Sequence, residues 1–76
     1  MNEQSQDLRA LLLQTDEEFN QLAAKHHELE SRLHELHSKH YLAEPEQFEE
    51  VTLKKRKLQL KDRMEDIMRR RRDQHH

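Results

Sequence analysis

Side chains that are mostly apolar recur along residues 8–40 at alternating steps of four and three residues. This heptad spacing gathers them into one continuous seam along an α-helix, as in coiled coils. The first heptad positions are Leu12, Phe19, His26, Leu33 and His40. The fourth positions are Leu8, Thr15, Leu22, Leu29 and Leu36. The seam predicts a helix that packs against another helix.

The chain has very few residues that interrupt a helix. Its 76 residues include no Gly and one Pro, and 39% of them are charged. Because tight turns commonly use Gly to reach positive φ angles, such a chain has few turns. Leu, Ile, Val and Phe make up only 16 residues, which is near the range of disordered chains. The periodic seam decides between these readings, and it favours an all-α fold of one or two long helices.

Pro45 marks the clearest boundary along the chain. Proline disfavours helical geometry at the preceding Glu44 and suits the first position of a new helix. We therefore expect a two-helix, coiled-coil-like antiparallel hairpin over residues 15–72. Its parts are helix 1 at about 16–41, a turn at about 42–44 and helix 2 at about 45–71. A single long helix kinked at Pro45 is the alternative.

The two ends of the chain are expected to lie outside this hairpin. Residues 1–14 form an N-terminal extension or a short helix, and residues 73–76 form a tail. Thr15 and Glu18 match the pattern of a capping box, which predicts a helix start near residue 15. The unbroken heptad phase instead favours one continuous helix from Leu8.

Helix 2 is expected to carry apolar residues on two opposite sides. One side joins the helix 1 seam in a hairpin core of Phe19, Leu22, His26, Leu29, Leu33, Leu36, Leu53, Leu60, Met64 and Ile67. The other side carries Phe48, Val51 and Leu58. Because one neighbouring helix cannot cover both sides, we expect this second stripe to mediate self-association into a dimer or tetramer that forms a helical bundle. Isolated exposed apolar residues are the alternative interpretation.

Charge is distributed unevenly along the chain. Residues 1–50 carry 12 acidic and 4 basic side chains, whereas residues 51–76 carry 4 acidic and 10 basic ones. Complementary halves suit an antiparallel hairpin. The basic half also predicts an alternative function, the binding of nucleic-acid phosphates. The candidate residues are Lys54, Lys55, Arg56, Arg69, Arg70, Arg71 and Arg72. They have no aromatic residues among them for base stacking, so nucleic acid ranks as the second choice of partner.

Two segments resemble a known family. FNQLAAKHHELESRLHEL and EEVTLKKRKLQLKDRMEDIM are similar to the YdcH-like family of small bacterial proteins. LKKRKLQLKDRM at residues 53–64 is the most specific part, and the spacing from Phe19 to Leu29 is the second signature. The resemblance covers residues 15–68. It implies a short, coiled-coil-prone helical protein without an assigned enzymatic activity.

Histidine is concentrated in one segment, with five residues between positions 26 and 40. His27, Glu30, His34 and His37 lie on one ridge of the predicted helix. However, His27 and His37 are about 15 Å apart, so one helix supplies too few ligands for zinc. We therefore expect no metal site and no cofactor. His26 is expected to set the register of the seam, and pH sensing is the alternative.

The sequence contains no recognisable catalytic pattern. It has no Cys, and none of its three Ser residues lies in a Gly-rich context. MNEQSQDL lacks the basic region of a signal peptide, and no segment approaches the ~20 apolar residues of a membrane span. We expect a small, non-catalytic interaction or scaffold protein in the cytoplasm that binds itself and could also bind another protein.

Overall fold

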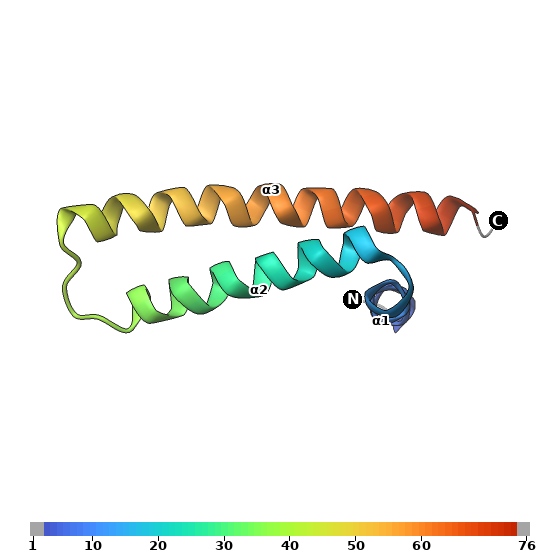
Figure 1. Ribbon diagram of the computed structural model, residues 1–76, viewed down its shortest axis with the longest axis horizontal. Coiled ribbons are helices and arrows are strands. Elements are labelled where there is room, and N and C mark those ends of the chain that lie inside the picture. Colours follow the sequence, from blue (N-terminus) through green and yellow to red (C-terminus); the bar gives the residue numbers. More distant parts are fainter. Residues whose placement is uncertain (1–2, 75–76) are drawn as a thin grey trace.

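The computed structural model describes residues 3–74, with side chains from Gln6 onward. It contains the helices α1 (Glu3–Thr15), α2 (Glu17–His37) and α3 (Glu44–Gln74). α2 and α3 lie side by side and run in opposite directions, and α1 contacts both at the end opposite their linker (Figure 1). The all-α prediction is confirmed. The described chain has a third helix, α1, in addition to the two of the expected hairpin, and a short helix was one of the two expectations for residues 1–14. The last two residues of the expected tail lie outside the described residues.

A sharp break at Asp16 separates α1 from α2. Asp16 has an extended backbone (φ −118°, ψ 111°), and its Oδ1 accepts a 2.8 Å hydrogen bond from the Phe19 N–H. It therefore caps the N-terminus of α2, where Glu17 and Glu18 favour the helix dipole. The expected cap, Thr15, instead ends α1 and donates its hydroxyl to the Leu11 carbonyl over 2.8 Å. The Asp16 carboxylate, and not the Thr15 hydroxyl, is therefore the acceptor that lies next to the unpaired N–H groups of the first turn of α2.

The linker between α2 and α3 is longer than expected, at residues 38–43 instead of 42–44. α2 ends at His37 because the Ser38 N–H closes a turn onto the His34 and Glu35 carbonyls. α3 begins at Glu44, one residue before Pro45, and continues to Gln74. Its first turn is capped by Glu46, whose Oε1 accepts a 3.1 Å hydrogen bond from the Ala43 N–H. These local bonds reverse the chain without any residue at positive φ among those described.

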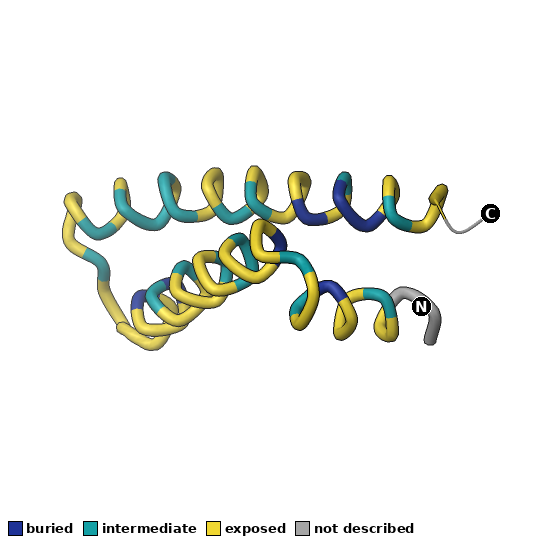
Figure 2. The backbone as a smooth tube through the Cα atoms, turned by 45° about the vertical axis from the view of Figure 1, so that its right-hand side comes forward, coloured by how far each residue is buried: buried dark blue, intermediate teal, exposed yellow. Residues whose placement is uncertain are grey.

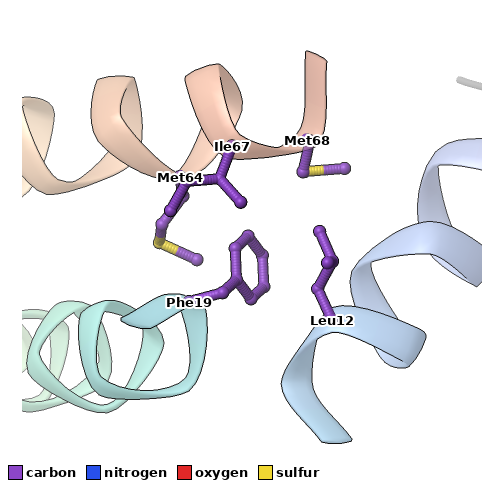
Figure 3. Packing of buried hydrophobic residues seen from close by; sticks show 5 residues of the cluster. All are labelled: Leu12, Phe19, Met64, Ile67 and Met68. Carbon is purple, nitrogen blue, oxygen red and sulfur yellow. The ribbon is translucent and has the colours of Figure 1, made fainter. Parts of the chain in front are cut away.

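The core lies where all three helices meet. Leu12 of α1, Phe19 of α2 and Met64, Ile67 and Met68 of α3 form one buried cluster (Figure 3). Leu12 and Phe19 are completely shielded from solvent. The cluster thus fixes α1 onto the pair formed by α2 and α3. The expected hairpin core did not include any residue of α1.

The remaining predicted core positions differ in burial. Leu33 and Leu36 are buried near the linker end of α2 (Figure 2). The half-buried positions along the helix pair are Leu22, His26, Leu29, Leu53 and Leu60. The middle of the pair is therefore a narrow seam whose flanks reach solvent.

Ion pairs of both senses join α2 to α3 along this seam. Arg32 donates two hydrogen bonds, of 2.8 and 2.9 Å, to the two carboxylate oxygens of Glu49. Arg63 donates two bonds, of 3.0 and 2.8 Å, to Glu18 Oε2 near the other end of α2. The bond from Arg32 holds the pKa of the Glu49 carboxyl below its ordinary value. Pairs at both ends of α2 hold the two helices in register.

We predict that Leu12→Ala destabilises the fold by about 2–5 kcal/mol, since it leaves a cavity in the three-helix cluster. Leu11→Ala is the matched control, because Leu11 is 47% exposed on the same helix, and we expect a change within about 0.5 kcal/mol. Urea unfolding followed by circular dichroism measures both. Equal effects of the two substitutions would show that α1 is not docked on α3.

We predict that acid weakens the Arg32–Glu49 pair. The lowered pKa of Glu49 means that its contribution is fully present above pH 4.5, the ordinary glutamate value, and is lost as pH falls through the lower folded value. Glu49→Gln should therefore lower the urea midpoint near neutral pH. The difference from wild type should shrink under acid, when both side chains are neutral. Glu28→Gln, at an exposed carboxylate, is the control, and a pH-independent difference for Glu49→Gln contradicts the assignment.

Candidate functional site

One side of α3 exposes apolar residues to solvent. Phe48, Val51 and Leu58 are 75%, 60% and 58% exposed, respectively. At 100° per residue they fall within one third of the helix circumference, on the side opposite Leu53 and Met64. We call these three residues the outer face of α3. Their exposure leaves this face free to contact another helix.

A second surface is an open groove of about 670 Å³ lined by residues of α1, α2 and α3. Its cationic residues and histidine are Arg9 of α1, His26 of α2 and Lys57, Lys61, Arg69 and Arg72 of α3. We call this set the basic groove. Two carboxylates, Glu30 and Glu65, also line it, and the methionines Met64 and Met68 supply its apolar lining. Its five Lys and Arg residues outnumber these carboxylates and favour an anionic ligand.

Only part of this positive charge is neutralised inside the molecule. Glu30 lies 3.8 Å from Lys57 Nζ and 3.5 Å from His26 Nδ1. Among residues 6–74, whose side chains are described, Arg9, Lys61 and Arg72 form no ion pair. Within this part of the chain, these three cations therefore have no carboxylate partner and can bind an external anion.

The structure separates the basic residues that the sequence grouped together. Arg69 and Arg72 line the basic groove, whereas Lys54, Lys55 and Arg56 lie outside it. The other two arginines of the predicted set, Arg70 and Arg71, form ion pairs within the molecule.

Those two arginines bind carboxylates within the molecule. Arg70 Nη2 donates a 2.5 Å hydrogen bond to Asp66, which holds the pKa of that carboxyl below its ordinary value. Arg71 Nη2 lies 3.4 Å from Asp16 and so joins the C-terminal part of α3 to the cap of α2. Neither guanidinium lines the basic groove.

Sequence reasoning did not select three of the groove cations, Arg9, Lys57 and Lys61. Lys57, Lys61, Glu65 and Arg69 succeed one another at steps of four, which places them on one ridge of α3. That spacing was a usable signal for the α3 side. Arg9 carries no comparable signal, because its position depends on how α1 folds back.

The histidine-rich segment does not assemble a metal site in the part of the chain that the structure describes. No three His, Cys, Asp or Glu side chains of that part lie close enough together to hold an ion. His37 Nε2 instead lies 2.8 Å from a carboxylate oxygen of Glu50 on α3. Within residues 3–74, no helix combines the length and the apolar character that a bilayer span requires.

Comparison with known proteins identifies a family for this chain. The family model described as a protein of unknown function, DUF465, matches residues 19–68. No curated protein and no solved structure matches the chain. The matched segment contains α2 from Phe19 onward and most of α3, and it leaves out α1. The match extends over well over half of the sequence, and the chain therefore belongs to the DUF465, or YdcH-like, family.

Proposed function

We propose that this chain is a small, non-catalytic interaction protein that self-associates through the outer face of α3. The exposure of Phe48, Val51 and Leu58 on one side of the longest helix carries the proposal. Three large apolar side chains on one helix side form a stripe that a second helix can cover. The proposed site of action is the cytoplasm, and the proposal includes no cofactor.

The elongated shape of the molecule supports the proposal that it associates with a partner. Its radius of gyration is 15.2 Å, whereas a compact chain of this length has a radius of about 11 Å. It exposes 6226 Å² to solvent, whereas a compact monomer of this mass exposes about 5,000 Å². The excess is comparable to the ~800 Å² that each partner buries in a standard protein interface.

A second copy of the chain in antiparallel orientation is the partner that fits the charges of α3. Residues 44–53 carry four Glu and no Lys or Arg, whereas residues 54–63 carry six Lys or Arg and one Asp. Antiparallel α3 helices place the acidic segment of each copy beside the basic segment of the other. A parallel pair would place Lys55 beside the Lys55 of the second copy.

The register of this pair follows from the outer face. When Phe48 lies opposite Leu58 of the second copy, Val51 lies opposite Lys55 of that copy. The aliphatic stem of Lys55 can then cover Val51 while its ammonium group stays in water. This arrangement uses all three apolar residues. It leaves the basic groove uncovered, because Lys57 and Lys61 lie on another side of α3, and Arg69 and Arg72 lie beyond the stretch of α3 that faces the second copy's α3 in this register.

We predict that the wild-type chain has a solution mass of two or more chains by light scattering after size exclusion, and that this mass persists on dilution. Val51→Glu combined with Leu58→Glu places charge in the apolar contact and should lower the mass to one chain, 9.4 kDa. Tyr41→Ser is the matched control, because Tyr41 is 79% exposed in the linker. It should leave the mass unchanged.

A monomeric wild type, or a double variant that keeps its mass, would contradict self-association through this face. The orientation is tested separately. The chain has no Cys, so Phe48→Cys and Leu58→Cys variants each carry a single thiol. Mixing them under oxidation should give mainly the mixed disulfide, whereas disulfides between identical variants would indicate a parallel pair.

A further inference from the structure

We propose that the basic groove binds the phosphate backbone of single-stranded nucleic acid, without regard to base sequence. This activity goes beyond self-association and uses a different side of α3. The juxtaposition that carries it is the row of Lys57, Lys61, Arg69 and Arg72 on α3 with Arg9 of α1, all lining one groove.

The extent of the row indicates a linear polyanion. Lys57 and Arg72 are 15 residues apart, which corresponds to about 22 Å along an α-helix. A single phosphate group would use only one or two of these cations. A stacked strand advances about 3.4 Å per nucleotide and carries one negative charge on each. About six nucleotides would therefore lie along the row.

Much of the positive charge of the groove is not neutralised by carboxylates within residues 6–74. Elsewhere on the molecule, inter-helix contacts occupy several arginines, as with Arg32 on Glu49 and Arg63 on Glu18. In the groove, Arg9, Lys61 and Arg72 form no ion pair among residues 6–74. Glu30 is shared by two partners, and Arg69 lies 3.9 Å from Asp66, which also pairs with other arginines. Binding a polyanion here would break few internal contacts. Three of the five Lys and Arg residues are arginines, whose planar guanidinium groups can bind phosphate in a bidentate manner.

The shape of the groove selects a single strand and backbone contacts. Met64 and Met68 are almost fully buried, so the floor offers little surface to a base. Among the residues whose side chains are described, no Phe, Tyr or Trp lines the groove, and its one aromatic ring is the half-buried His26 imidazole, so the groove offers little surface for base stacking. The molecule measures 50 × 20 × 18 Å, and the cations form one row along its length, which matches the single line of phosphates of one strand. The contacts therefore go to phosphates, which carry no sequence information directly.

An acidic peptide is the competing partner, and the row favours nucleic acid over it. A nucleic-acid strand presents a charge at every nucleotide, so it matches the row in any register. A peptide must carry acidic residues at matching positions.

Arg9, Arg69 and Arg72 lie outside residues 19–68, which the family model matches. The groove is thus completed by parts of this chain that the family model does not describe.

The test is fluorescence anisotropy with a labelled oligothymidylate of about a dozen nucleotides, a length within the site sizes of single-strand binders. We expect affinity to fall with salt, with a slope of log K against log salt of about −3.5, as roughly five neutralised phosphates require. Lys61→Gln combined with Arg72→Gln should weaken binding about tenfold and make the slope shallower by one to two units. Both residues lack ion pairs within residues 6–74, so we expect the helicity to be retained.

The matched control is Lys25→Gln combined with Arg56→Gln. These exposed residues line a separate hollow between α2 and α3 and change the net charge by the same amount. The control should bind as wild type does. Equal weakening by the two double variants, no binding at low salt, or displacement of the oligonucleotide by a lower concentration of polyglutamate would each overturn the proposal. The Val51→Glu and Leu58→Glu variant should retain binding per chain, so the two proposals can fail independently.

Discussion

The packing of Phe19 against Leu12 and the three apolar residues Met64, Ile67 and Met68 determines how the rest of the molecule is arranged (Figure 3). Phe19 lies in the first turn of α2, immediately after the break at Asp16. Its N–H group is held by the Asp16 side chain, and Arg71 approaches the same carboxylate from α3. Asp16 thus takes part both in the turn that redirects the backbone and in the contact with Arg71 that joins α2 to α3.

This junction also fixes the rotation of α3 about its own axis. With Met64 and Ile67 directed into the cluster, the outer-face residues point into solvent and the Lys57–Arg72 row lies beside α1. α3 therefore has three different sides along its 31 residues. One side is the core, one is apolar and exposed, and one is cationic. Because core, exposed apolar and cationic positions alternate along α3, its sequence shows no single apolar stripe.

The two proposed activities follow from this division and do not compete for surface. An antiparallel pair formed through the outer face leaves a basic groove on each copy. The two grooves are related by the twofold axis of such a pair. Each groove alone has a modest number of contacts, but two grooves joined in one assembly can bind one long strand with greater avidity than either alone. Self-association would then strengthen binding without adding any residue to the groove.

The sequence by itself determined the helical character of the chain, the boundary near Pro45 and the two apolar sides of α3. These properties depend on interactions between residues that are close in sequence, such as side chains three or four apart and hydrogen bonds of a capping turn. The tertiary structure alone decided whether α1 continues α2 or folds back at Asp16. The heptad phase is compatible with both, and the choice depends on whether Leu12 reaches Met64 and Met68, about fifty residues further along the chain. The basic groove depends on the same choice, because Arg9 joins Lys57 and Lys61 only when α1 docks on α3.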